Sequence, residues 1–331
     1  MFPKKNKIKA LVMGAMLVGF VFCVAGVVWG SLEGCDSSLL RDAYKRIPSG
    51  QHDQQARFAF FGDTRNNAGI MEAIISEIEN DGGYDFMMCS GDMVDHCTEC
   101  GFEYFCQESM EELKDTPYIF IPGNHDYNVG QPDEGALYRR YFGEPYYSFD
   151  IGNTLFLALD NANKFIGEKQ YQWMEDVLQK RRSDFTNLIV FMHGPPVDLR
   201  GGGAWHAMDK QDGRKLFDLL VKYNVTTIYC SLIHDYYEWE YEGVPIYVSG
   251  GAGARQSRNR PPTYHYLEVV VAKDGKIMTT LREVFLPNEQ EDKYEHFFIV
   301  GMHPYYLPLA ASFVIGLSIM GFLALRAKKA V

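Results

Sequence analysis

The sequence predicts an α/β fold in which parallel strands are connected by helices. Two observations support this prediction: short apolar runs alternate with amphipathic stretches from residue 57 onward, and several of the apolar runs end in polar side chains. Strands that alternate with helices are typical of β-α-β units, whose strands are parallel. In open sheets of this kind, the loops at the carboxyl ends of the strands form the ligand site.

The first half of the folded region has the order strand, helix, strand, helix, strand. Residues 71–79 are predicted to be helical because Ile74, Ile75 and Ile78 lie on one face of a helix. The remaining elements are, in chain order, the strand RFAFFGD (57–63), the strand DFMMCSGD (85–92), the helix GFEYFCQESMEELK (101–114) and the strand PYIFIPGNHD (117–126).

The second half contains more strands. Residues 146–161, YYSFDIGNTLFLALDN, predict two adjacent strands with a turn near Gly152, and residues 236–284 are mostly β in pattern. Between these regions, predicted helices and strands alternate in the segments EKQYQWMEDVLQKRR (168–182), NLIVFMHGPP (187–196), KLFDLLVKYN (215–224) and TTIYCSLIHD (226–235).

An apolar block without Asp, Glu, Lys or Arg lies near each end of the chain, at residues 10–30 and 303–325. A helix of about 20 residues is about 30 Å long, which matches the hydrocarbon core of a bilayer. Each block is therefore predicted to be a transmembrane helix. The alternatives are a cleaved signal peptide for the first block, although its apolar region normally has only about 7–15 residues, and a buried core helix for the second.

Basic residues lie on the terminal side of both apolar blocks, within residues 1–9 and 326–331. The positive-inside rule then predicts that both of these tails are cytoplasmic. The folded domain, predicted over residues 36–284, would lie on the non-cytoplasmic side of the membrane. Residues 285–298 are charged and contain a proline, which suits a tether to the second block.

The net charge of the chain is -11. Because both terminal tails are basic, the folded domain is more acidic than this value. Nucleic acid is therefore not expected as a partner. A phosphate-containing substrate remains compatible with this charge, since bound cations reverse the sign of the local field.

Three of the seven cysteines, Cys97, Cys100 and Cys106, lie close together in the sequence. In a cytosolic protein such a C-x-x-C pair suggests zinc or redox chemistry, but no second pair completes a four-ligand site. Outside the cytoplasm a disulfide among these three cysteines is expected instead, with Cys35 as a further candidate partner.

Side chains with oxygen or imidazole donors follow five of the predicted strands. They are Asp63, Asp92, the run Asn124-His125-Asp126, His193 and His234. Packing alone rarely requires such residues at five strand ends on one edge of a sheet. Carboxylate, amide and imidazole together suit divalent metals such as Mn, Fe or Zn. Two such ions that share a carboxylate would hold a phosphoryl group and generate a metal-bound hydroxide.

The same segments resemble the calcineurin-like metallophosphoesterase family, whose pattern is D-x-H, G-D-x-x-D, G-N-H-D/E, a lone His, and G-H-x-H. The matching segments are GDTR (62–65), GDMVD (91–95), GNHD (123–126), His193 and SLIH (231–234), in the same order. The resemblance covers roughly residues 57–284. It implies a four-layer α/β/β/α sandwich of two mixed sheets flanked by helices.

The resemblance also implies ligands for two divalent metal ions. Asp63, Asp92 and His234 would hold the first ion. Asp92, as the bridge between the ions, would hold the second ion together with Asn124 and His193.

The resemblance assigns catalysis to the residues beside these ligands. His125 would protonate the leaving-group oxygen as a general acid, with Asp126 orienting its ring. Such a proton donor contributes about 10²–10⁴-fold in rate. Arg65 stands where the family often has a His ligand. Two roles are predicted for its guanidinium, to clamp the substrate phosphate or to form a structural ion pair.

A second departure from the family pattern is Leu232, which stands in place of the first His of G-H-x-H. Because leucine cannot bind a metal ion, the second site is left with three protein ligands and is expected to be weaker. His96 and His206 are the nearest spare histidines that are candidates to replace the missing ligand.

These residues predict a membrane-anchored phosphoesterase that hydrolyses a phosphomonoester or phosphodiester through a metal-bound hydroxide, with His125 as general acid. Anchoring at both ends suggests a lipid-linked or envelope substrate; the alternative is that it serves only to retain the protein at the membrane. The alternative is a metal-poor, non-catalytic family member that binds a phosphorylated or protein ligand. Leu232 favours this alternative, whereas the retained pair His125 and Asp126 argues against it.

Overall fold

The structure is a computed structural model of the chain. It describes residues 12, 14–25, 35–50, 54–128, 135–200, 206–256, 263–285 and 302–329. The chain divides into two compact units, of which the larger is Cys35–Glu289 and the smaller joins Met1–Gly34 with Gln290–Val331. The larger unit contains both sheets and the candidate site.

The first sheet has the strand order β11-β10-β1-β2-β3. Its strands are β1 (Ala56–Phe61), β2 (Phe86–Cys89), β3 (Tyr118–Phe120), β10 (Tyr264–Val271) and β11 (Ile277–Val284). β1, β2 and β3 pair in parallel, as predicted, whereas β10 pairs antiparallel with both β1 and β11. The sheet is therefore mixed, and the carboxyl ends of β1, β2 and β3 meet at one edge.

The second sheet has the strand order β4-β5-β6-β7-β9-β8. Its strands are β4 (Tyr147–Ile151), β5 (Thr154–Ala158), β6 (Asn187–Phe191), β7 (Thr227–Cys230), β8 (Tyr236–Tyr241) and β9 (Val244–Ser249). The predicted turn near Gly152 is confirmed, since β4 and β5 form an antiparallel hairpin around it. β5, β6, β7 and β9 pair in parallel, so their carboxyl ends also share an edge.

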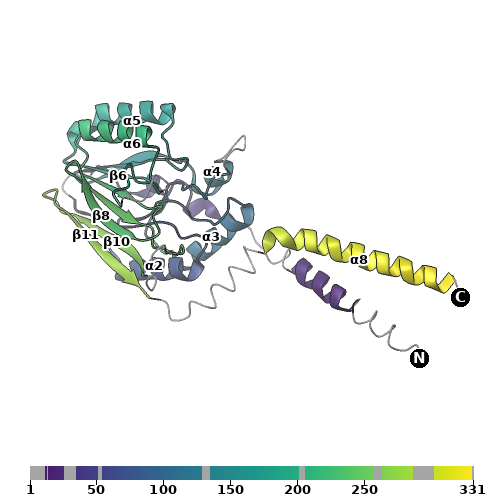
Figure 1. Cartoon of the computed structure of the whole chain (residues 1–331). Coiled ribbons are helices and arrows are strands. Elements are labelled where there is room, and N and C mark those ends of the chain that lie inside the picture. The colour runs from purple at the N-terminus through teal and green to yellow at the C-terminus, as the bar shows by residue number, and fades with distance from the viewer. Residues whose placement is uncertain are drawn as a thin grey trace. The chain divides into compact units, whose positions relative to one another are not determined.

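Helices cover the outer faces of the two sheets (Figure 1). Buried residues of α2 (Ala68–Asp81) and α3 (Glu99–Glu112) pack on the first sheet, and those of α5 (Glu168–Arg181) and α6 (Lys210–Lys222) pack on the second. α4 (Ala136–Phe142) and the short helices η1 (Ser37–Leu39), η2 (Ala43–Arg46) and η3 (Arg182–Asp184) complete this unit. Two mixed sheets flanked by helices confirm the predicted sandwich.

Aromatic rings fill the space between the sheets. Phe58 on β1 stacks on Phe86 of β2 at 4.8 Å between ring centroids, and it meets Phe156 of the second sheet edge-on at 5.7 Å. Because successive strand residues point to opposite faces, the neighbouring Ala59 and Phe61 pack instead among the residues that contact α2 and α3. β1 is thus buried on both faces, which explains its nearly continuous apolar sequence.

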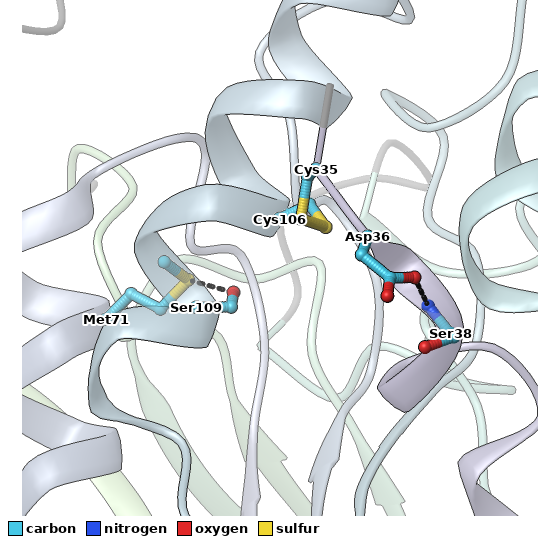
Figure 2. Close-up of a disulfide and its surroundings, with 6 residues drawn as sticks. All are labelled: Cys35, Asp36, Ser38, Met71, Cys106 and Ser109. Carbon is cyan, nitrogen blue, oxygen red and sulfur yellow. Dashed lines mark hydrogen bonds between the residues drawn. A yellow bond between two sulfur atoms is a disulfide. The ribbon is translucent and has the colours of Figure 1, made fainter. Parts of the chain in front are cut away.

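A disulfide joins Cys35, at the start of the larger unit, to Cys106 on α3, with their Cα atoms 5.9 Å apart (Figure 2). The expected disulfide among Cys97, Cys100 and Cys106 is therefore wrong, and Cys35 is the partner. Cys97 and Cys100 both lie outside this disulfide. The helix rules out a bond between Cys100 and Cys106, because six residues of α-helix place them about 9 Å apart along the axis. That separation exceeds the usual Cα spacing of a disulfide, which is about 4.4–6.8 Å.

Replacing Cys106 with Ser is expected to lower the free energy of unfolding by about 2–4 kcal/mol, because the disulfide closes a loop with a sequence separation of 71 residues. Urea unfolding of the full chain measures this loss, and a reducing agent should bring the parent to the value of the variant. Cys97→Ser is the matched control, since Cys97 lies outside this disulfide. Equal stability of the parent and Cys106→Ser without reductant would contradict the prediction.

The smaller unit contains a helical stretch at residues 14–25 and the helix α8 (His303–Lys329). Cys23, Tyr306 and Ala310 form a small buried cluster in this unit. No helix in the described part of the chain combines the length and the hydropathy that a membrane span requires. Residues 1–9, parts of the predicted span 10–30 and most of the predicted tether lie outside the described residues.

Candidate metal centre

Asp63 lies just beyond β1 and is fully buried. Its φ of 61° is in the left-handed region, which Asp tolerates better than most residues. Its Oδ2 accepts a hydrogen bond from the Leu232 backbone N–H at 2.9 Å. Its Oδ1 is buried and has no hydrogen-bond partner among the described residues, and it lies 3.4 Å from Nε2 of His234.

Asp92 lies just beyond β2 and is also buried and left-handed, with a φ of 54°. Its Oδ1 accepts the backbone N–H of His125 at 2.8 Å and lies 3.5 Å from Nε2 of His193. A Cβ added to Gly123 would lie 2.3 Å from this same oxygen, so the loop that follows β3 requires glycine there. Asp92 therefore sits where the loops after β2, β3 and β6 meet.

His193, beyond β6, has a fixed ring orientation. Its Nδ1 lies 2.8 Å from the Ser90 carbonyl oxygen and 3.0 Å from Oγ of Ser231. Because Nδ1–H is held by these oxygens, Nε2 is left to bind another group. A carbonyl or hydroxyl partner at one ring nitrogen is typical of metal-binding histidines. Nε2 points to Asn124, with 3.2 Å between Nε2 and Oδ1.

His234 lies beyond β7 at the more open side of the centre, with 27% of its side chain exposed. Its Nδ1 lies 3.0 Å from the Arg255 carbonyl oxygen, which again leaves Nε2 facing the carboxylate of Asp63. Burial lowers the pKa of His234, but the negative charge of Asp63, whose Oδ1 lies 3.4 Å from Nε2, outweighs that effect and raises the pKa overall. Burial likewise raises the pKa of Asp63, and its charge interactions with His234, His193 and Arg65 bring it below its usual value.

The structure brings all five predicted metal ligands together. One ligand atom from each of Asp63, Asp92 and His193 lies within 4.8 Å of the others, Asn124 contacts His193, and His234 faces Asp63. A buried carboxylate oxygen without a donor is costly, and a cation is the usual partner that removes this cost. The buried Oδ1 of Asp63, which accepts no hydrogen bond within the described part of the chain and has Nε2 of His234 at 3.4 Å, therefore fits a divalent metal ion, as do the mixed oxygen and imidazole donors.

The neighbours of His125 differ from those expected. Its Nδ1 lies 2.7 Å from the carbonyl oxygen of Asp95, and its Nε2 lies 3.9 Å from Oδ2 of Asp92. Asp126 was expected to orient this ring, but its buried carboxylate instead accepts the backbone N–H groups of Asp92, Val94 and Gly123. Burial and the nearby Asp92 raise the pKa of Asp126, while these three bonds oppose the rise. Asp126 thus joins the loops after β2 and β3.

Arg65 also lies at the centre, with a left-handed φ of 51° and 19% of its side chain exposed. Its Nε donates to Oδ1 of Asp95 at 2.8 Å, and its Nη1 lies 3.5 Å from Oδ2 of Asp92. The ion pair with Asp95 fixes the guanidinium beside the shared carboxylate. This position is compatible with contact to an anion bound at the centre.

Leu232 occupies the position of the missing ligand, and a Cβ added to Gly194 would lie 3.1 Å from its Cδ2. Its backbone is left-handed, with a φ of 63°, a conformation that histidine adopts more readily than leucine. His96 is exposed, and neither His96 nor His206 belongs to a group of potential metal ligands within the described residues. The structure thus offers no substitute for the missing imidazole at either position.

Leu232→His is expected to strengthen metal binding, because it adds an imidazole next to His193 at a backbone that suits histidine. The gain in affinity should be about tenfold or more, since even an outer-shell partner contributes about 10–100-fold. Equilibrium dialysis against manganese measures this change, with Leu199→His, an exposed leucine of a neighbouring loop, as the control. An affinity that is unchanged in Leu232→His would contradict the prediction.

Ser90 and Ser231 are site residues that the sequence pattern did not reveal. Both are fully buried, and the Ser90 hydroxyl donates to Oγ of Ser231 at 2.8 Å. The Ser90 carbonyl oxygen and Oγ of Ser231 both lie beside Nδ1 of His193. Ser90 directly precedes GDMVD and Ser231 is the first residue of SLIH, but the sequence alone does not distinguish a buried hydroxyl from an exposed one.

A family model described as calcineurin-like phosphoesterase matches residues 56–236. The human serine/threonine-protein phosphatase CPPED1 is 27% identical over 175 residues, which are 49% of this chain and 54% of that protein. A probable glycerophosphodiester phosphodiesterase GpdQ from Arcobacter nitrofigilis is 30% identical over 162 residues, which are 45% of this chain and 56% of that protein. The chain spans about half the length of these curated relatives.

Solved structures share the fold. The purple acid phosphatase PPD1 from yellow lupin superposes with a TM-score of 0.57 at 20% identity, covering 72% of this chain and 54% of that one. A dimetal phosphatase from Danio rerio superposes with a TM-score of 0.54 at 13% identity, covering 69% of this chain and 96% of that one.

Proposed function

Because this chain belongs to the calcineurin-like phosphoesterase family, we propose that it hydrolyses a phosphate ester at a centre of two divalent metal ions. The observation that carries this proposal is the convergence of Asp63, Asp92 and His193, whose ligand atoms lie within 4.8 Å of one another. The buried Oδ1 of Asp63, which accepts no hydrogen bond from the described residues, supports it further. Asp63, Asp92 and His234 would hold one ion, and Asp92, Asn124 and His193 would hold the other.

When bound, ions such as Mn, Fe or Zn would polarise the phosphoryl group and lower the pKa of the attacking water. Among the protein's own residues, Asp92 belongs to both proposed ligand sets, and its carboxylate faces the ligands of both ions. Arg65 is held by Asp95 and would contact a phosphate oxygen through its remaining N–H groups. These charges would fix the orientation of the substrate before the reaction.

His125 is the proposed general acid. The Asp95 carbonyl holds its Nδ1, which leaves Nε2 to give a proton to the leaving-group oxygen. With 31% of its side chain exposed, the ring borders both the centre and solvent, as a proton donor to a departing group must. Asp126 would act indirectly, by fixing the loops that present Asp92 and His125.

The substrate class in this proposal includes both monoesters and diesters, since the relatives named above are a phosphatase and a phosphodiesterase. We also propose that the catalytic domain lies on the non-cytoplasmic side of a membrane, close to a lipid-linked phosphate ester. The basic flanks of the two terminal apolar blocks support this placement. So does the disulfide between Cys35 and Cys106, because disulfides persist mainly in oxidising compartments.

Metal dependence tests the proposed activity. The full chain is stripped with a chelator and titrated with manganese, while bound metal and hydrolysis of p-nitrophenyl phosphate and bis(p-nitrophenyl) phosphate are measured together. Hydrolysis should be lost on chelation and return with metal, and the ratio of the two rates should narrow the substrate class. A folded chain that binds metal poorly and hydrolyses neither ester would refute the activity and favour a non-catalytic binding protein, for which Leu232 is the main support.

Alkylation of intact cells tests the proposed location. Rapid trapping with a thiol reagent, followed by peptide mass spectrometry, reports the redox state of Cys35 and Cys106. The two cysteines should resist alkylation until they are reduced. Free thiols at both positions in growing cells would contradict the non-cytoplasmic placement.

A further inference from the structure

We propose that Asn161, together with Asp160, positions the half of the centre formed by Asn124 and His193. These two residues follow β5, a strand that supplies none of the predicted metal ligands. The inference rests on the proposed function in one respect only, namely that this half of the centre binds a metal ion.

Asn161 holds the loop that carries His193. Its Oδ1 accepts the backbone N–H of His193 at 2.9 Å and that of Gly194 at 3.2 Å. Its Nδ2 donates to the Gly194 carbonyl oxygen at 2.7 Å. Asn161 is 2% exposed, so these bonds do not compete with bulk water.

The position of Asn161 explains why a side chain is needed there. The backbone pairing of β5 with β6 ends with the bond from the Leu159 N–H to the Phe191 carbonyl oxygen, at 2.9 Å. Beyond this point the two chains separate into loops. Through its amide, Asn161 continues the cross-strand hydrogen bonding by two residues, up to His193 and Gly194.

Asp160 holds the other loop. Its Oδ2 accepts the hydroxyl of Tyr127 at 2.6 Å, and Tyr127 directly follows the GNHD segment that contains Asn124. Asp160 is itself anchored to α5, because its backbone N–H and carbonyl oxygen bond the side-chain amide of Gln170 at 2.8 and 2.7 Å. The loops after β3 and β6 are thus attached to adjacent residues of one rigid segment.

This common attachment sets the distance between the two metal ligands. Oδ1 of Asn124 and Nε2 of His193 are 3.2 Å apart, although their loops follow strands of two different sheets, β3 and β6. Metal binding requires ligands to be held within about 0.5 Å of their productive positions. Loss of the Asn161 contacts would leave the His193 N–H without this partner, while its carbonyl would still accept the Ser231 N–H at 2.8 Å and the bonds at Nδ1 of its ring would remain.

Asn161→Leu, which keeps a similar volume and removes every polar contact, tests this inference in the full chain. The matched control is Asn187→Leu, because Asn187 is also buried, at 3% exposure, and its Nδ2 donates to the Gly275 carbonyl oxygen at 2.9 Å. Asn187 begins β6, at the end of that strand away from the centre. Manganese affinity and stoichiometry are measured by calorimetric titration, and the unfolding temperature is measured without metal.

Asn161→Leu is expected to weaken the binding of one manganese ion by about 10–100-fold, the usual effect of losing an outer-shell partner. Asn187→Leu should lower the unfolding temperature and leave the manganese titration unchanged. If Asn161→Leu does not fold, Asn161→Ser and Asn187→Ser replace the pair, since serine shortens the side chain without burying an apolar group.

Three results would overturn the inference. Manganese affinity in the Asn161 variant equal to that of the parent would refute the positioning role and leave the proposed function intact. A parent chain that binds no metal would refute the proposed function and this inference with it. Equal losses of affinity in the Asn161 and Asn187 variants would show a general effect of destabilisation, and that result also counts against the inference.

Discussion

Asp92→Asn should reduce metal-dependent hydrolysis by about 10³-fold or more. Removal of a single preorganised donor from an active site typically costs about 10²–10³-fold, and Asp92 is proposed to bind both metal ions. A ligand atom of its carboxylate lies within 4.8 Å of ligand atoms of both Asp63 and His193, so it faces the ligands proposed for both ions. An amide has the same shape but no charge, and it cannot serve as an anionic bridge.

Asp150→Asn is the matched control for this variant. Asp150 is another buried aspartate, and it bonds the Gly50 N–H and the guanidinium of Arg181. It pairs with Leu155 near the start of β5, at the edge of the second sheet opposite the centre. Its loss should lower stability and leave hydrolysis largely intact. Activity in Asp92→Asn within tenfold of the parent would contradict the proposed bridging role.

His125→Gln should lower kcat by about 10²–10⁴-fold, but only for esters whose leaving group needs a proton. The Asp95 carbonyl orients the ring so that Nε2 faces the centre, and glutamine cannot replace it as an acid. The kcat for phenyl phosphate should therefore fall by the full factor. The kcat for p-nitrophenyl phosphate, whose leaving group is stable as an anion, should fall much less.

His96→Gln provides the control, because His96 is an exposed histidine that follows Asp95 in the sequence. Rates for the two esters are compared in the parent and in both variants at the same metal occupancy. If His125→Gln lowers the two rates equally, His125 binds substrate or metal and is not the proton donor. If neither rate changes, the ring has no part in the reaction.

Much of the fold was predictable from the sequence, because the local pattern determines it. Phe58 and Phe60 point between the sheets while Ala59 and Phe61 face the helices, so β1 is apolar apart from Arg57. The disulfide was predictable only in part: Cys35 was a candidate partner, but it lies 71 residues from Cys106, and the local sequence pattern does not show that the fold brings the two together.

The candidate ligands were predictable for a different reason. Asp63, Asp92 and His193 each follow a parallel strand, and parallel strands bring their ends to one edge. The contacts of Asp126 were not predictable, because adjacent loop residues point in unrelated directions. Asn161 carried the same signal as the ligands, an amide just beyond an apolar strand. The sequence does not show that the Asn161 side-chain amide bonds the backbone of His193 and Gly194.

The disulfide between Cys35 and Cys106 also has a mechanical consequence. Tension applied to the chain at Cys35 passes through the sulfur atoms into α3, so the intervening residues do not carry the load. β1, α2 and β2 lie inside this closed loop, whose ends are 71 residues apart. Asp63 and Asp92 are therefore in a part of the domain that pulling from the amino-terminal side cannot stretch until the disulfide is reduced.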